Sequence, residues 1–142
     1  MVLFVAGIVY GSMVDGKGLR TVVFLSGCSV HCPSCHNKSY WLKENGKKIP
    51  IDLLTQQIRK NTPQKKLTIS GGEPLEQLPA VNELISLLPD FDIGLYTSYH
   101  IKDLKKDLLS KLSFVKTGRF EKDKLIVGKY FGSSNQEMIY LK

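Results

Sequence analysis

The stretch TVVFLSGCSVHCPSCHN, residues 21–37, passes directly from an apolar run into a loop that holds every cysteine of the chain. Residues 21–26 are mostly β-branched, aromatic or aliphatic and are followed by a glycine, which predicts a buried β-strand. The thiols then follow with the spacing C-x3-C-x2-C, as Cys28, Cys32 and Cys35. We call residues 28–37 the cysteine loop. The stretch therefore predicts a strand whose carboxyl end carries a cluster of thiols.

Alternating strands and helices continue along the chain. Further strands are predicted from apolar runs at residues 1–13, 66–70, 91–97 and 113–117. Helices are predicted from apolar residues at helical spacing, over residues 51–60, 78–88 and 101–112. The last 25 residues have the pattern of strands and turns with little helix. This alternation is typical of an α/β fold with a mostly parallel sheet and right-handed crossovers.

The length of the chain limits which α/β fold it can form. A complete eight-stranded α/β barrel takes about 250 residues, whereas this chain has 142. We therefore expect one domain over residues 1–142, built as an open partial (β/α) barrel or a short doubly wound sheet. In such folds the chemistry gathers at the carboxyl ends of the strands.

Composition and charge exclude several classes of protein. No segment approaches the ~20 apolar residues that span a bilayer, and the apolar start lacks the basic leader and cleavage site of a signal peptide. The formal net charge is +7, but the lysines are spread over solvated helix faces and turns. We therefore expect a cytoplasmic protein with no membrane association and no direct nucleic acid binding.

The cysteine loop admits two metal chemistries. A disulfide framework is disfavoured because the cysteine count is odd and the expected compartment is reducing. A structural zinc site needs four protein ligands, so His31 or His36 would complete it. An iron–sulfur cluster usually takes four thiolates, and three on a four-iron cluster would leave one iron open to a small molecule.

A second motif follows another predicted strand. SGGEP, residues 70–74, comes at the carboxyl end of the strand at 66–70. Its glycines allow a ligand to approach the backbone closely, and Pro74 biases Glu73 toward an extended conformation. By itself the motif is compatible with an ordinary turn before a helix.

Together the two motifs resemble those of the radical S-adenosylmethionine (SAM) enzymes. The resemblance implies that Cys28, Cys32 and Cys35 bind a [4Fe-4S] cluster and that SAM chelates the open iron. It implies that SAM is cleaved reductively to a 5′-deoxyadenosyl radical. It also implies a SAM-binding set in two segments, Ser34, Cys35 and His36 near the adenine, and Ser70, Gly71, Gly72 and Glu73 near the methionine end.

Other segments resemble the glycyl-radical-enzyme activases. Residues 14–41 contain the D-G-x-G-x-R run that these activases carry before the cluster strand, and LYTSYH at 95–100 is similar to their Tyr-Thr-Gly-Tyr region. GRF at 118–120 and GSSNQ at 132–136 resemble the end of the anaerobic ribonucleoside-triphosphate reductase activating proteins. This resemblance implies a glycyl radical made on the large reductase subunit, with electrons from a flavodoxin-type donor.

The chain departs from these patterns at three positions, and two rival functions stay open. Lys17 stands where proline is usual, Ser34 where an aromatic residue is frequent, and Ser98 where glycine is common. Asp15, Gly16, Gly18 and Arg20 fit a turn into the strand and a contact with the protein substrate equally well, so their roles, and those of residues 133–136, are not assigned. One rival is an activase for a different glycyl radical enzyme. The other is a zinc-stabilised Cys3His module that binds nucleic acid.

Overall fold

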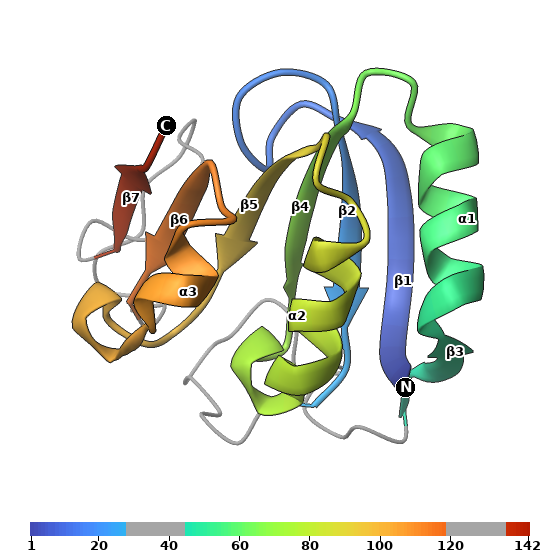
Figure 1. Ribbon diagram of the computed structural model, residues 1–142, viewed down its shortest axis with the longest axis horizontal. Coiled ribbons are helices and arrows are strands. Elements are labelled where there is room, and N and C mark those ends of the chain that lie inside the picture. The colour runs from blue at the N-terminus through green and yellow to red at the C-terminus, as the bar shows by residue number, and fades with distance from the viewer. Residues whose placement is uncertain (28–44, 119–135) are drawn as a thin grey trace.

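The computed structural model describes residues 1–27, 45–118 and 136–142. In this part of the chain seven strands form one sheet in the order β3-β1-β2-β4-β5-β6-β7 (Figure 1). The strands are β1 Val2–Ser12, β2 Arg20–Leu25, β3 Lys47–Pro50, β4 Lys66–Gly71, β5 Asp92–Tyr96, β6 Phe114–Thr117 and β7 Glu137–Tyr140. The α-helices are α1 Ile51–Asn61, α2 Leu78–Ser86 and α3 Lys106–Leu109, and the 3₁₀ turns are η3 Pro74–Gln77 and η4 Ile101–Asp103.

The sheet is mixed, which corrects the prediction of a mostly parallel sheet. Strands β2, β4, β5 and β6 are parallel to one another, as predicted. At the margins, however, β1 pairs antiparallel with both β2 and β3, and β7 pairs antiparallel with β6. Strands β1 and β2 are antiparallel because residues 13–19, which connect them, are too few for a parallel crossover, which needs a dozen or more residues.

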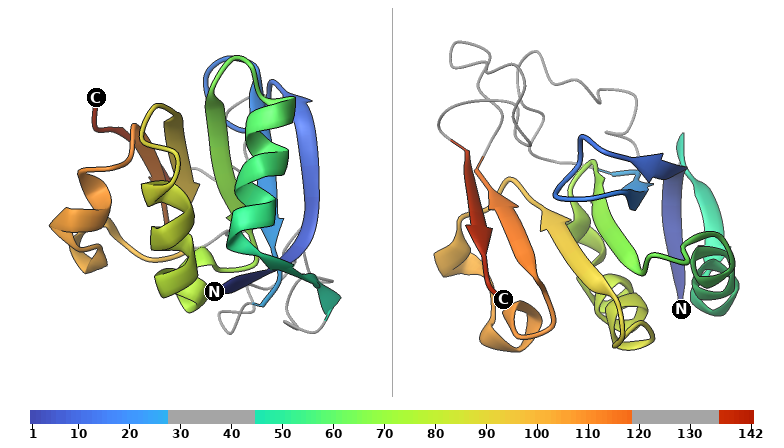
Figure 2. Two further views of the ribbon diagram at one scale, coloured as in Figure 1. Left: turned by 45° about the vertical axis from the view of Figure 1, so that its right-hand side comes forward. Right: turned by 90° about the horizontal axis from the view of Figure 1, so that it is seen from above.

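All three α-helices cover the same face of the sheet (Figure 2). Helix α1 starts after Pro50 and ends before the Thr62–Pro63 pair, where proline disfavours a further helical turn. Asp52 in its first turn and basic residues in its last turn complement the helix dipole. Its buried side chains recur at helical spacing, at Ile51, Leu54 and Ile58.

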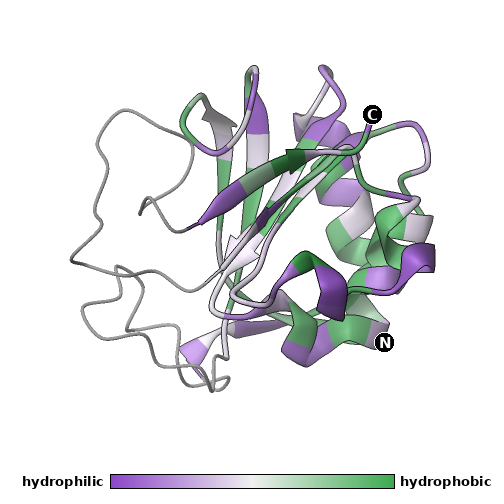
Figure 3. Ribbon diagram, turned by 90° about the vertical axis from the view of Figure 1, so that its left-hand side faces the viewer, coloured by the Kyte–Doolittle hydropathy of each residue, from purple (hydrophilic) through white to green (hydrophobic). Residues whose placement is uncertain are grey.

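A continuous core fills the space between the helices and the sheet. The apolar middle of the strands and the adjoining parts of the helices stand out in Figure 3. Leu67 and Ile69 of β4 and Leu84 of α2 are completely buried in this core. Each such side chain contributes about 1.5–3 kcal/mol relative to an exposed one, so the core fixes the positions of the strand ends.

Most of the predicted elements within the described residues are confirmed, with one exception. The helix predicted over 101–112 is instead divided into η4 and α3, because Leu104 and Lys105 adopt extended conformations. Leu104, Leu108 and Leu112 are nevertheless buried. The three leucines are therefore buried by a segment that consists of η4, α3 and the residues flanking them, and not by one continuous helix.

Some sequence predictions concern residues outside the described part. They are those for Cys28, His31, Cys32, Ser34, Cys35 and His36, and for residues 119–135. Within the described residues, none of the helices has the length and apolar character required to cross a bilayer.

Candidate functional site

The residues that follow the parallel strands are connected at one edge of the sheet. Strands β2, β4, β5 and β6 run in the same direction, so their carboxyl ends meet at this edge. The chain there reaches Gly27 after β2, the SGGEP motif at the end of β4, and Thr97 after β5. Main-chain and side-chain hydrogen bonds join these segments to one another. This edge is the candidate functional site.

The SGGEP motif is attached to the residues that precede the cysteine loop. The main-chain nitrogen of Gly72 donates to the carbonyl oxygen of Leu25 at 2.8 Å, and that of Glu73 donates to the carbonyl oxygen of Gly27 at 2.8 Å. Gly71 has a φ of +109°, and a Cβ at this position would lie 2.2 Å from the nitrogen of Leu25. Only glycine therefore permits this close approach. These hydrogen bonds hold the SGGEP motif against Gly27, which is the residue before Cys28 in the sequence.

Glu73 presents a buried carboxylate that three donors orient. Its side chain is 0% exposed. One oxygen, Oε2, accepts from the hydroxyl of Thr97 at 2.8 Å and from the main-chain nitrogen of Leu75 at 2.9 Å. The other, Oε1, accepts from the main-chain nitrogen of Ser98 at 2.7 Å. The carboxylate therefore holds the end of β4 against the end of β5.

Burial raises the pKa of Glu73 above its ordinary value, although the three hydrogen bonds oppose this rise. In the described part of the chain, no lysine, arginine or histidine forms an ion pair with this carboxylate. A carboxylate can accept about four hydrogen bonds, and Glu73 accepts three. The site thus contains an oriented acceptor whose charge is not balanced by a described cation.

The remaining parallel strand joins the same network. The nitrogen of Thr97 donates to the carbonyl of Lys116 in β6 at 2.9 Å, and the nitrogen of Gly118 donates to the carbonyl of Tyr99 at 3.2 Å. The side-chain amide of Gln136, which is 7% exposed, then donates to the carbonyl of Gly118 at 3.0 Å. The described ends of the GRF and GSSNQ segments are therefore in direct contact.

Ser98 and Lys17, two of the departures from the family pattern, are accommodated without strain. Among the described residues, the only non-glycine residue with positive φ is Lys65. Ser98 therefore does not need the conformational freedom of glycine, and its main-chain nitrogen still reaches Glu73. Lys17 lies between Gly16 and Gly18, which have positive φ.

The D-G-x-G-x-R run lies at the opposite, amino-terminal edge of the parallel strands. Arg20 is 1% exposed and forms an ion pair of 2.9 Å with Asp92 at the start of β5. It also donates to the hydroxyl of Thr68 and to the carbonyl oxygen of Leu67. Asp15 accepts from the hydroxyl of Thr68 through its carbonyl oxygen. The run fastens the β1–β2 connection to the sheet, which agrees with the turn into the strand, one of the two roles that the sequence left open for it.

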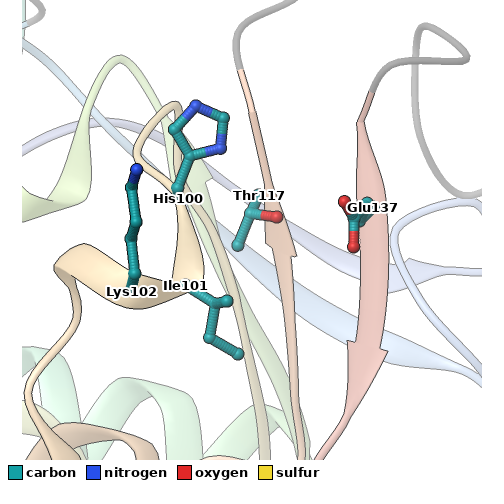
Figure 4. A pocket seen from close by; sticks show the side chains of 5 residues that line it. All are labelled: His100, Ile101, Lys102, Thr117 and Glu137. Carbon is teal, nitrogen blue, oxygen red and sulfur yellow. The ribbon is translucent and has the colours of Figure 1, made fainter.

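A small pocket lies next to the carboxyl ends of β5 and β6 and was not predicted from the sequence. It has a volume of about 230 Å³ and is lined by His100, Ile101, Lys102, Thr117 and Glu137 (Figure 4). These residues come from segments far apart in the chain, and only His100 falls within a motif singled out above. Basic and acidic groups occur together in the pocket, which suits a polar ligand.

Comparison with known proteins gives the class of the chain. A family model described as "4Fe-4S single cluster domain" matches residues 14–139. The chain therefore belongs to this class of iron–sulfur domains.

Individual relatives define the family more narrowly. An anaerobic ribonucleoside-triphosphate reductase-activating protein of Enterobacteria phage T4 is 31% identical over 88% of this chain and 86% of its own length. A relative of the same name from Pasteurella multocida (strain Pm70) is 32% identical over 90% of this chain and 90% of its own length. Another, from Escherichia coli (strain K12), is 28% identical over 92% of this chain and 94% of its own length. The chain belongs to the family of anaerobic ribonucleoside-triphosphate reductase-activating proteins.

Proposed function

We propose that the chain is a radical SAM activase that generates a glycyl radical on the large subunit of anaerobic ribonucleoside-triphosphate reductase. The observation that carries this proposal is the hydrogen bond from Glu73 to Gly27, which attaches the SGGEP motif to the residue that precedes Cys28 in the sequence. The membership of the 4Fe-4S domain family supports the iron–sulfur part of the proposal. The names of the relatives support the choice of partner.

Three thiolates would hold the cluster, Cys28, Cys32 and Cys35. Because the set has three members, one iron of a four-iron cluster would be left for SAM. When bound and reduced, the cluster supplies one electron to the sulfonium of SAM, whose C–S bond breaks to give methionine and a 5′-deoxyadenosyl radical. The proposed activity would then require transfer of a hydrogen atom from the partner's glycine, which would yield 5′-deoxyadenosine and a glycyl radical. A flavodoxin-type protein would donate the electron.

Glu73 is suited to the ammonium group of SAM. Its carboxylate is buried, oriented by three donors and without an ion pair among the described residues. A cation beside it would favour the charged form and lower the raised pKa. Gly71 and Gly72, with Ser70, would line the methionine end, and the backbone at Ser34 and His36 would contact the adenine.

The architecture supports a protein substrate. Strands β3 and β7 form the two ends of the described sheet, and they do not pair with each other. We propose that residues 1–142 form one open partial barrel of the radical SAM type, in the cytoplasm. Its open side would admit a loop of the reductase to the carboxyl ends of the strands.

The test is to reconstitute the chain anaerobically with iron and sulfide, reduce it, add SAM and quantify 5′-deoxyadenosine. We expect product from the wild type and none from Cys32→Ala. A wild type that binds zinc, does not incorporate iron and forms no 5′-deoxyadenosine would contradict the proposal. His31 and His36 would then be the residues to mutate next. Incubation of the active protein with different glycyl radical enzymes would then distinguish the reductase from other partners.

A further inference from the structure

Gln77 bridges the SGGEP segment and the strand that leads to the cysteines. It is the last residue of η3, the turn that begins with the proline of the motif, and is 7% exposed. Its Oε1 accepts from the main-chain nitrogen of Phe4 at 2.9 Å. Its Nε2 donates to the carbonyl oxygens of Phe4 at 3.2 Å and Ser26 at 3.0 Å. The carboxamide therefore joins β1, the end of β2 and η3.

Gly46, which follows the cysteine-containing segment in the sequence, lies next to Ser26. Both the main-chain nitrogen and the hydroxyl of Ser26 donate to the carbonyl of Phe4, at 2.9 and 3.2 Å. Gly46 lies against this pair so closely that a Cβ would be 2.0 Å from the hydroxyl oxygen of Ser26 and 3.1 Å from the carbonyl carbon of Val5. The residues on either side of the cysteine-containing segment thus meet beside the group that Gln77 binds.

We infer that Gln77 is a positioning residue that fixes the carbonyl of Ser26, directly after β2, relative to the SGGEP segment and thereby slows loss of the cluster. The inference rests on the proposed function, because it takes the three cysteines as the cluster ligands. Ser26 is two residues before Cys28 in the sequence, so displacement of its carbonyl would move the end of the described strand that leads to the first proposed ligand. Groups that orient metal ligands commonly change metal retention by roughly 10- to 100-fold when they are removed.

The chemistry of the carboxamide distinguishes its substitutes. Gln77→Met keeps a similar length but loses all three hydrogen bonds. Gln77→Glu keeps the acceptor for Phe4 but loses both donated bonds, and an ionised carboxylate would face the carbonyl oxygens of Phe4 and Ser26. Gln56→Met is the matched control, because Gln56 is exposed on α1.

The experiment measures how fast each anaerobically reconstituted full-length variant releases iron to a chelator. It also records the EPR spectrum of the reduced cluster and the thermal midpoint of the cluster-free protein. We expect roughly tenfold faster release and an altered EPR spectrum for Gln77→Met, with Gln56→Met unchanged. If Gln77→Met does not fold, Gln77→Glu is measured in its place, and it too should release iron faster than the wild type and show an altered EPR spectrum.

The possible failures are separable. A purely structural role would lower the thermal midpoint while the release rate and the EPR spectrum stay those of the wild type, and that result would overturn the inference. The wild type would still cleave SAM in that case, so the proposed function would stand. A wild type that holds no iron–sulfur cluster would overturn both.

Discussion

The main-chain nitrogen of Glu73 lies 2.8 Å from the carbonyl oxygen of Gly27, and the hydrogen bond between them joins residues that are 46 positions apart in the chain. The bond forms because β2 and β4 are parallel neighbours whose carboxyl ends meet at one edge. Main-chain bonds of this kind do not depend on side-chain identity, but they do require the two backbones to approach closely. Gly71 is the residue that permits that approach.

Gly71→Ala is expected to destabilise the protein by about 3 kcal/mol, because the new Cβ would meet the backbone of Leu25 and the residue has a positive φ. Gly7→Ala is the control. A Cβ at Gly7 would meet nothing within 4 Å, so its effect should stay within about 0.5 kcal/mol. Chemical denaturation of both variants gives the comparison. Equal stabilities for the two would mean that β2 and β4 are not held together at this edge.

Arg20→Ala is expected to lower the free energy of unfolding by about 3 kcal/mol, because it removes a buried, multiply hydrogen-bonded cation. Below its melting temperature the variant should still cleave SAM, since Arg20 lies at the amino-terminal edge of the parallel strands. Arg59→Ala, which removes an exposed guanidinium, should affect stability much less. If Arg20→Ala instead keeps its stability and loses activation of the reductase, Arg20 contacts the partner and the structural role is wrong.

The ionisation of Glu73 should appear in the pH dependence of stability. Its folded pKa is raised above the ordinary value of 4.5, so between the two pKa values the folded state binds more protons than the unfolded state. The contribution of Glu73 to the free energy of unfolding is therefore greatest below its unfolded pKa and is lost as the pH rises through its folded pKa. A difference of one unit between the folded and the unfolded pKa corresponds to about 1.4 kcal/mol in the free energy of unfolding.

Urea denaturation of the cluster-free protein at several pH values measures this contribution. The difference in free energy of unfolding between the wild type and Glu73→Gln should change across that pH range, falling as the pH rises. Glu83→Gln, a change on the exposed surface of α2, should show no such trend against the wild type. A wild type and Glu73→Gln with parallel pH profiles would mean that the carboxylate is not desolvated.

The elements with strong local patterns could be predicted from the sequence. Strands β2, β4, β5 and β6 are short apolar runs, and α1 has apolar residues at helical spacing. The antiparallel direction of the margin strands could not be read from those runs, because strand direction depends on the connections. The split between η4 and α3 was also missed, since an interrupted segment and one continuous helix can bury the same leucines.

The site shows the same division between local and long-range information. SGGEP was identified from its own residues and from the strand before it. Gln77 lies in no motif. Arg20 and Gln136 lie in recognised segments, but their buried hydrogen bonds could not be predicted because their partners are distant in the sequence. Gln136 meets Gly118 across 18 residues, and Arg20 meets Asp92 across 72. Only the folded arrangement shows which of these polar residues are buried.

The most direct test of the central claim is to follow one hydrogen atom. The large subunit of the anaerobic reductase would be produced with deuterated glycine and mixed anaerobically with the reconstituted chain, a reductant and SAM. We predict an EPR signal of a glycyl radical on the reductase and one deuterium in the 5′-deoxyadenosine that is released, both absent with Cys32→Ala. Deoxyadenosine without deuterium, from a reductase that shows no radical, would contradict the account.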